Sequence, residues 1–426
     1  MRVLFVTPYV PSRIRVRPFH AIQALATSHE VSLVALVCDA YERELAREIE
    51  PYCASFDLVS LPKRQAYANC IRALPTLTPL RVAYYQSPAF IERILEVIRA
   101  RKINVVHGEL IKTAPALRAV LEQTGVPVVY DSVDCISSYL EQQWQTVRNP
   151  LKRAFVYSEY KKMQRYEARM SASFSATVIT SPHDKEVLSR LQQWYGDAKR
   201  VEQARKVGVI SVVPNGVDTC YFTPPNVPRQ RDSLVFCAKM DYYPNVQAML
   251  SFRDEVLPRL WKHRPDVRLT IVGNNPPVAI QELASDARIT VTGYVPDTRP
   301  YLGKASVALA PLRVAAGMQN KVLEAMAMGT PLVATPSSCR ALDVQHERHL
   351  LLAQEYEAFA QAILRLLEDD VLALTLSRAG RTFVEQHHSW DATASLLTDV
   401  YGQVVVAIRD TTRTAMVDSP KAVMAR

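Results

Sequence analysis

The sequence predicts an α/β fold with two doubly wound domains, and three observations support this. Short apolar runs of strand length alternate with amphipathic, helix-length segments, which is the rhythm of parallel sheets covered on both faces. This alternation stops once, at a junction over residues 208–232 that ends in the polar, proline-rich PPNVPRQRDS. The length of 426 residues suits two or three domains with ample core.

The strands are expected where short runs are rich in apolar and β-preferring residues. For the N-terminal domain (1–207) they are predicted at residues 2–7, 31–37, 56–61, 104–107, 126–130 and 176–180. For the C-terminal domain (233–388) they are predicted at residues 234–237, 267–272, 289–292, 306–311, 331–335 and 350–353.

Helices are expected between these strands, where apolar residues recur at helical spacing. They are predicted at residues 19–27, 41–50, 89–101, 150–173, 320–328, 355–368, 370–386 and 389–408, and one more begins at Ser181-Pro182, a cap followed by proline. Prolines at 75, 79 and 88 predict an irregular stretch over 63–88. The polar, aperiodic residues 411–426 are expected to be disordered.

Composition narrows the class of protein. Hydrophobic residues make up 48% and charged residues 22%, as in ordinary globular proteins, and no uncharged apolar run reaches the length of a membrane span. The apolar start MRVLFVTPYVP is too short for a signal peptide. Seven cysteines without a CxxC pair argue against a zinc site or a disulfide framework. We therefore expect a cytoplasmic protein without a bound metal.

The net charge of +9 is concentrated in the N-terminal half. Residues 1–205 hold 28 Lys and Arg against 20 Asp and Glu, whereas residues 206–426 hold 23 against 22. Anionic lipid, a lipid-diphosphate acceptor or nucleic acid could use this excess, and solvated helix surface accounts for it equally well. No nucleic-acid-binding motif is present, so no nucleic-acid partner is expected. The basic, aromatic helix 150–173 suits peripheral contact with an anionic membrane at the inner face of the cell membrane, and packing of one helix face with the charges solvated explains its composition equally well.

One stretch, AAGMQNKVLEAMAMGTPLVATP at residues 315–336, is predicted to form a loop, a short helix and a strand. Gly317 allows close approach to the backbone just before the helix. Lys321 and Glu324 are three residues apart and share a helix face near its N-terminus. A cation, free amides and the positive end of the helix suit a diphosphate, and the carboxylate suits a pair of sugar hydroxyls. An exposed Lys–Glu pair is the alternative.

This stretch resembles the donor-site signature of family 4 (group 1) glycosyltransferases. The matching residues are Gly317, Glu324, Ala325, Met326, Ala327, Gly329, Pro331, Val333 and Ala334. The resemblance implies the GT-B fold, in which two Rossmann-like domains face each other across a cleft and a last helix, here 389–410, crosses back to the N-terminal domain. The first of the family's two glutamates falls on Ala316, so that carboxylate is missing.

The resemblance also implies an activity. Such enzymes move a hexose, with retention and without metal, from a UDP- or GDP-sugar to a hydroxyl acceptor on a glycan or a lipid-linked glycan. The segments MDYYPN and GMQNKVLEAMA are most similar to sugar transferases of bacterial exopolysaccharide clusters. The nucleotide sugar is a substrate, and no cofactor is expected.

The donor-side residues follow from the same resemblance. Lys239, Gly317 and Lys321 would bind the donor diphosphate, Glu324 would bind the ribose, and the turns at Gly273-Asn274 and Tyr294-Val295 would surround the base. The family's second lysine is absent from YYPNV, and we expect Lys321, together with Arg313, to replace its charge.

The N-terminal candidates stand at predicted strand ends. The family often has a histidine and a polar residue there, so His107, Glu109, Asp131 and Asp134 are candidate contacts to the sugar or acceptor. Two carboxylates in DxxD do not make a metal site, and Asp131 could instead cap the following helix. The loop residues Arg13, Arg15 and Arg17 could grip phosphate, with His20 at the next helix start; a basic surface loop is the alternative.

Two other functions remain compatible with this sequence. One is a sugar-nucleotide epimerase on the same fold, which would turn over the donor without an acceptor. The other is a non-catalytic binding protein, made credible by Ala316 and the missing lysine, which would bind nucleotide weakly or not at all.

Overall fold

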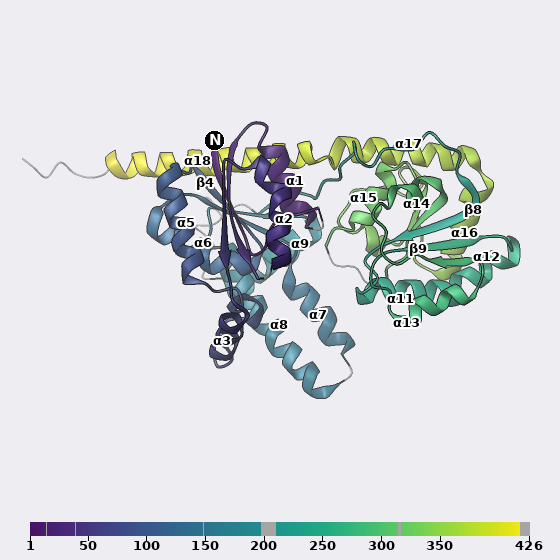
Figure 1. Cartoon of the computed structure of the whole chain (residues 1–426), viewed down its shortest axis with the longest axis horizontal. Helices are drawn as coiled ribbons and strands as arrows, with labels where there is room; N and C mark the ends of the chain where they lie inside the picture. Colours follow the sequence, from purple (N-terminus) through teal and green to yellow (C-terminus); the bar gives the residue numbers. More distant parts are fainter. Residues whose placement is uncertain (14, 39, 148, 197–209, 314–316, 418–426) are drawn as a thin grey trace, which may run out of the picture. The chain divides into compact units, whose positions relative to one another are not determined.

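The computed structural model describes residues 1–13, 15–38, 40–147, 149–196, 210–313 and 317–417. The chain divides into two compact units (Figure 1). The N-terminal unit comprises Met1–Val213 and Thr393–Arg426, and the C-terminal unit comprises Pro214–Ala392. Both units are built on parallel sheets with helices, so the predicted α/β class is confirmed.

The described strands of the N-terminal unit form one seven-stranded parallel sheet. Its order is β3 (Ser55–Ser60), β2 (Glu30–Val37), β1 (Arg2–Thr7), β4 (Val105–Glu109), β5 (Val128–Val133), β6 (Ala176–Ile179) and β7 (Ile210–Val212). Alternate residues of β1 face opposite sides: Val3 and Phe5 enter one apolar cluster, Leu4 and Val6 the other. Burial on both faces explains why these strands are continuous apolar runs.

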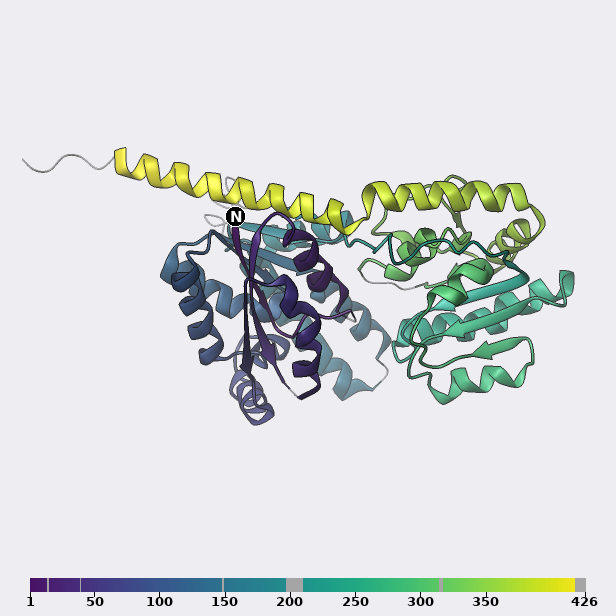
Figure 2. The same cartoon turned by 45° about the horizontal axis from the view of Figure 1, so that its top comes forward.

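Helices cover both faces of this sheet. The cluster that holds Val3 and Phe5 includes side chains of α1 (Val16–Leu25), α2 (Ala40–Ile49) and α18 (Trp390–Val417). The opposite cluster includes residues of α5 (Pro88–Arg101), α6 (Ala114–Thr124) and α8 (Pro150–Ser171), with single residues from α4 (Leu80–Ala83) and α7 (Ile136–Thr146). Figure 2 shows α18 lying along the N-terminal unit. It continues to Val417, whereas residues 411–417 were expected to be disordered.

The stretch 63–88, expected to be irregular, contains the helix α3 (Lys63–Ala73) and the short α4. The prolines that suggested irregularity do not interrupt a helix. Pro79 is the N-cap of α4, and Pro88 is the first residue of α5. Proline is compatible with a helix start because the first amide groups lack intrahelical acceptors in any case.

The C-terminal unit repeats this design. Its described strands form a six-stranded parallel sheet in the order β10 (Ile289–Val291), β9 (Arg268–Val272), β8 (Gln230–Cys237), β11 (Ala305–Ala310), β12 (Leu332–Ala334) and β13 (Leu351–Leu352). Both β7 and the start of β8 fall within residues 208–232, which we had assigned to a junction.

Two apolar clusters flank this second sheet. One contains residues of α11 (Tyr243–Ser251), α12 (Leu257–His263) and α16 (Tyr356–Glu368). The other contains residues of α14 (Arg299–Lys304), α15 (Asn320–Ala327) and the end of α17 (Asp370–His387). In this fold class, ligands bind beyond the carboxyl ends of the strands, where the loops to the next helices begin.

Candidate functional site

The helix α15 follows the loop beyond the carboxyl end of β11. Val322, Leu323, Ala325 and Met326 are buried, so the apolar face of this eight-residue helix is fixed in the core. Gly329 ends it in the left-handed region, with φ 60°, where a side chain would be strained. The remaining face carries the two charged residues of the predicted pair, one turn apart.

Lys321 and Glu324 lie in a poorly solvated position. The Lys321 ammonium donates to Asn245 Oδ1 at 2.9 Å and to Gln319 Oε1 at 3.0 Å. Burial lowers the pKa of Lys321 to about 8, although Glu324 opposes the shift. Burial raises the pKa of Glu324 to about 7, opposed by Lys321. The Lys321 ammonium has lost part of its hydration through burial, and an anionic ligand would compensate for that loss. Perturbed pKa values of this kind are common at binding sites.

Asn245 is a site residue that the sequence reasoning missed. Its side chain is buried in the first turn of α11, where it accepts from Lys321 and donates from Nδ2 to the Lys239 carbonyl at 2.8 Å. The side-chain amide of Asn245 thus holds both the Lys321 ammonium and the backbone of the loop that follows β8. The Pro-Asn pair in MDYYPN could have pointed to this residue. Proline favours the first turn of a helix, and the asparagine lies in that turn of α11.

The other predicted diphosphate contacts differ from Lys321. The Lys239 ammonium is exposed and lies 3.5 Å from an Asp241 carboxylate oxygen. Arg313 donates to the Gln354 carbonyl at 3.2 Å and lies over the Tyr356 ring, so it is held at the start of α16. Gly317 has φ 62° just before α15. Ala316 lies outside the described residues.

The two turns predicted to surround the base are adjacent. The Gly273 amide donates to the Gly293 carbonyl at 3.2 Å, and the Met240 amide donates to the Asn274 carbonyl at 3.1 Å. A Cβ on Gly273 would lie 1.7 Å from the Ala238 carbonyl oxygen, which explains the glycine. Tyr294 is 76% exposed, whereas its neighbour Val295 packs against the apolar core. Base binding by these turns stays a prediction.

In the N-terminal unit, the structure brings His107, Asp131 and Arg17 together. Arg17 Nε donates to Asp131 Oδ2 at 2.8 Å, and His107 Nε2 lies 3.4 Å from the same oxygen. Arg17 is 6% exposed and Asp131 1%. Burial by itself would raise the pKa of Asp131, but the Arg17 charge and the His107 contact lower it below its ordinary value.

The second ring nitrogen of His107 is also engaged. A hydrogen bond of 2.9 Å joins its Nδ1 to the Tyr401 hydroxyl of α18, and the ring stacks on Phe5 with centroids 4.4 Å apart. Both nitrogens therefore face protein groups, and the ring is buried. His107 and Asp131 are thus buried and contact other side chains of this unit, and their role as contacts to the sugar or acceptor stays a prediction.

The remaining acidic candidates are partly or wholly buried. Burial, and then the Asp131 charge, raise the pKa of Glu109 to about 8, so this carboxyl is protonated at neutral pH. Its Oε2 is buried and has no hydrogen-bond partner among the described residues. Burial, and then Asp184, raise the pKa of Asp134 to about 6. The charges of Arg17 and Asp131 also act on this carboxyl, the first lowering its pKa and the second raising it.

The three loop arginines lie in different surroundings. Arg17 is committed to Asp131, so it does not belong to a surface phosphate loop. Arg15 is 2.5 Å from Glu42 and stacks over Tyr9, and Arg13, with a 73% exposed side chain, is 3.5 Å from Glu48. His20 lies on α1, with Nδ1 3.2 Å from the Gln23 side-chain oxygen.

Asp131 does not cap the helix that follows it. The amides of Ile136 and Ser137, at the start of α7, donate to the Glu167 carboxylate at 2.6 and 3.2 Å. Glu167 lies on α8 and is buried, and burial raises its pKa to about 7 despite these bonds. A carboxylate from a neighbouring helix thus performs the role that we had considered for Asp131.

No group of three or more His, Cys, Asp or Glu side chains among the described residues is arranged to hold a metal ion. Among the same residues, no helix combines the length and apolar composition of a membrane-spanning segment.

Residues 231–369 match the family described as glycosyl transferases group 1. The chain is 27% identical over 238 residues to a phosphatidyl-myo-inositol mannosyltransferase of Mycolicibacterium smegmatis, covering 53% of this chain and 60% of that protein. It is 28% identical over 218 residues to a D-inositol 3-phosphate glycosyltransferase of Pseudarthrobacter chlorophenolicus, covering 46% and 50%. The chain thus spans less than two thirds of the length of these relatives.

Solved structures resemble the whole chain. A sucrose-phosphate synthase from Thermosynechococcus elongatus superposes with a TM-score of 0.68 at 18% identity, covering 96% of this chain and all of that one. HepE of Anabaena in complex with UDP superposes with a TM-score of 0.63 at 13% identity, covering 94% and 100%. The chain therefore has the GT-B fold, and its residues 231–369 match the family described as glycosyl transferases group 1.

Proposed function

We propose that this protein is a glycosyltransferase that moves a hexose from a nucleoside-diphosphate sugar to a hydroxyl of a glycan or lipid-linked acceptor. The observation that carries the proposal is the Lys321–Glu324 pair on α15, because a poorly solvated ammonium and carboxylate one turn apart match a diphosphate and a ribose diol. The group 1 match over residues 231–369 supports it.

In this proposal Lys321 stabilises the charge that develops on the departing diphosphate. Its ammonium is already oriented by Asn245 and Gln319, so little reorganisation is needed when the bond to the sugar breaks. Gly317 and the first amides of α15 would add hydrogen bonds to the phosphates. The reaction would proceed with retention and without metal, as the resemblance of residues 315–336 implies.

The names of relatives suggest the first donors to test. One relative is called a GDP-mannose-dependent phosphatidylinositol monomannoside mannosyltransferase, and HepE was solved with UDP. GDP-mannose and UDP-glucose are therefore the leading donors. For the acceptor, we propose a lipid-linked glycan in exopolysaccharide or cell-surface glycan synthesis, presented at an anionic membrane.

Replacing Glu324 with alanine should weaken binding of the cognate nucleotide about ten- to a hundredfold. The carboxylate would accept hydrogen bonds from two ribose hydroxyls, and a hydrogen bond to a charged group contributes roughly 1.5–3 kcal/mol. Calorimetric titration with GDP, UDP, ADP and their sugar conjugates measures this loss and identifies the base.

Glu282→Ala is the matched control, since Glu282 is an exposed glutamate of the same unit outside the site. Its nucleotide affinity should equal that of the wild type. Selective binding followed by sugar transfer only when acceptor is added would support the transferase. Donor turnover without acceptor would favour an epimerase, and no nucleotide binding by the wild type would favour the non-catalytic alternative.

The proposed membrane contact rests on the surface of α3 and α8. On α3 and the loop after it, Tyr67, Ile71, Leu74 and Leu77 are exposed, and Ile71 is 68% exposed. Tyr67, Ile71 and Leu74 follow helical spacing, so they share a face. The basic residues near this face are Lys63, Arg64, Arg72 and, on α8, Lys162, which donates to the Leu74 carbonyl.

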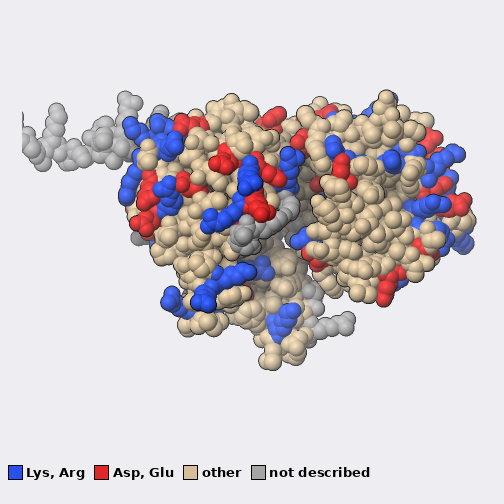
Figure 3. Space-filling model, in the orientation of Figure 1, with Lys and Arg blue, Asp and Glu red and all other residues tan. Residues whose placement is uncertain are grey.

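A space-filling view shows Lys and Arg side chains gathered over the α3 end of the N-terminal unit (Figure 3). Exposed apolar side chains beside cations are the composition of a surface that enters the headgroup region of an anionic bilayer. We call the four apolar residues Tyr67, Ile71, Leu74 and Leu77 the α3 apolar face.

The double variant Ile71→Asp/Leu74→Asp should lose most binding to vesicles that contain anionic lipid. Each carboxylate removes apolar contact and adds repulsion from the lipid charge, so we expect at least about a tenfold fall in the bound fraction in flotation. Val371→Asp, at an exposed apolar position of the C-terminal unit, should bind as the wild type does. Equal flotation of all three proteins would rule out this surface.

A further inference from the structure

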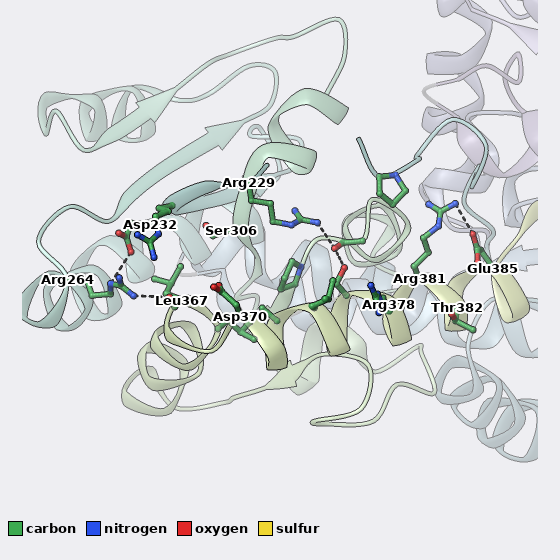
Figure 4. Close-up of a pocket in the computed structure, with 18 residues that line it drawn as sticks. Arg229, Asp232, Arg264, Ser306, Leu367, Asp370, Arg378, Arg381, Thr382 and Glu385 are labelled. Atoms are coloured by element: carbon green, nitrogen blue, oxygen red, sulfur yellow. Dashed lines mark hydrogen bonds and ion pairs between the residues drawn. The ribbon is translucent and has the colours of Figure 1, made fainter. Parts of the chain in front are cut away.

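A pocket in the C-terminal unit lies at the amino ends of the strands, whereas the candidate site follows the carboxyl end of β11. It has a volume of about 700 Å³ and is lined at the amino ends of β8, β11 and β12 and along α17. Figure 4 shows Arg229 on one side of this pocket, with Asp370, Arg378 and Thr382 of α17 on the other. Its size suits a small metabolite.

Five arginines and three acidic residues line this pocket, and four of these eight residues form two ion pairs. Arg264 is 3.0 Å from Asp232, and Arg381 is 2.8 Å from Glu385. The charged lining residues outside these two ion pairs are three arginines and one acidic residue: Arg229, Arg231, Arg378 and Asp370. We call Arg229, Arg231 and Arg378 the arginine trio. The pocket thus has a surplus of positive charge.

The members of the arginine trio could attract an anion, but their surroundings differ. Arg231 and Arg378 are exposed at the pocket, and neither forms an ion pair with a carboxylate within the part of the chain that the structure describes. Arg229 donates to the carbonyls of Ala305 at 2.9 Å and Gly329 at 2.6 Å, but burial still lowers its pKa to about 10. Guanidinium groups present paired donors that match phosphate oxygens.

The pocket is physically joined to the helix that carries the candidate donor residues. The carbonyl of Ala327, the last residue of α15, accepts from Arg381, and the Gly329 carbonyl accepts from Arg229 and from the Ser377 hydroxyl. Lys321 is the second residue of α15 and Glu324 is its fifth. Eight residues of α-helix extend only about 12 Å, so a shift at one end moves the other.

We propose that this pocket binds a phosphorylated small molecule, distinct from the donor, and that binding changes donor affinity through α15. The regulatory half of this inference rests on the proposed function, whereas the binding half stands without it. The phosphate of the ligand would contact Arg231 and Arg378. Its binding would also stabilise the hydrogen bonds that Arg229 and Arg381 donate to the carbonyls of Gly329 and Ala327.

The test uses fructose 1,6-bisphosphate and pyrophosphate as probes in calorimetric titrations of the full chain. Arg231→Ala/Arg378→Ala should weaken probe binding at least tenfold. Lys321→Ala should retain it, which separates this pocket from the donor site. The control Arg253→Ala/Arg268→Ala removes the same charge from two exposed arginines of this unit outside the pocket and should bind the probe normally.

The regulatory half is measured as nucleotide affinity with and without saturating fructose 1,6-bisphosphate. We expect at least a threefold change in the wild type and none in Arg231→Ala/Arg378→Ala. Absence of binding by both probes at millimolar concentration, or equal binding by that double variant, would overturn the pocket. Probe binding without any change in nucleotide affinity would overturn the coupling. A third outcome is that the wild type binds the probe, the double variant does not, and neither binds a nucleotide. This outcome would support the proposed pocket and contradict the proposed function.

Discussion

Arg17→Ala is expected to destabilise the N-terminal unit by about 3–5 kcal/mol, because it leaves the Asp131 carboxylate buried without its partner. Arg17 and Asp131 are almost fully buried and 2.8 Å apart, and His107 supplies only a weaker contact at 3.4 Å. Hydrogen exchange of the β1 and β5 amides should therefore accelerate more than about a hundredfold under native conditions.

Arg13→Ala provides the control for this measurement. Arg13 comes from the same loop and also lies near a carboxylate, but its side chain is 73% exposed, and exposed ion pairs contribute little. Its exchange rates should stay within a few-fold of the wild type. Slow exchange in Arg17→Ala would mean that Asp131 simply takes up a proton, and the pair would then not be a main support of this unit.

Lys321→Ala should lower kcat about 10²–10³-fold, the usual cost of removing one preorganised charge donor from a developing anion. The same reasoning predicts a pH dependence. The pKa of Lys321 is lowered to about 8, so in the wild type its positive charge, and with it turnover, is lost as pH rises above that value. Bound diphosphate would move this fall to higher pH by favouring the ammonium.

Two further variants make this test specific. Lys262→Ala, at an exposed lysine of the same unit, should leave kcat and KM unchanged. Lys321→Arg keeps its charge at all these pH values, so whatever activity it retains should not fall above pH 8. If Lys321→Ala raised only KM, Lys321 would serve binding and not the bond-breaking step, contrary to this mechanism.

Much of the fold was predictable because its signals are local. The predicted strand 2–7 matches β1 at both ends, and Ser181 caps α9 (Pro182–Tyr195) by accepting from the Asp184 amide. The helix α3 was missed because its apolar residues face outward at Tyr67 and Ile71, so its pattern lacks the usual buried stripe. The prediction also gave too little weight to Pro79 as the N-cap of α4, whereas the predicted helix 89–101 differs from α5 only at Pro88.

The candidate site was predictable only where its residues share one element. Lys321 and Glu324 are neighbours on α15 by helical spacing alone. Asn245 reaches Lys321 from 76 positions away, and Tyr401 reaches His107 from 294 positions away. No periodicity within a single sequence encodes such pairs, so the burial of His107 and Asp131 could not be foreseen.

The packing of α18 on the N-terminal unit has a consequence for how the chain folds. Leu397, Tyr401 and Val404 fill the same apolar cluster as Val3 and Phe5. Because α18 follows the C-terminal unit in the chain, the apolar cluster around β1 cannot be completed until that whole unit has been synthesised. Pairings of such long sequence separation form slowly, and the half-built sheet exposes apolar surface meanwhile. During synthesis the C-terminal unit can finish folding first, and the core of the N-terminal unit is completed only when α18 packs against it.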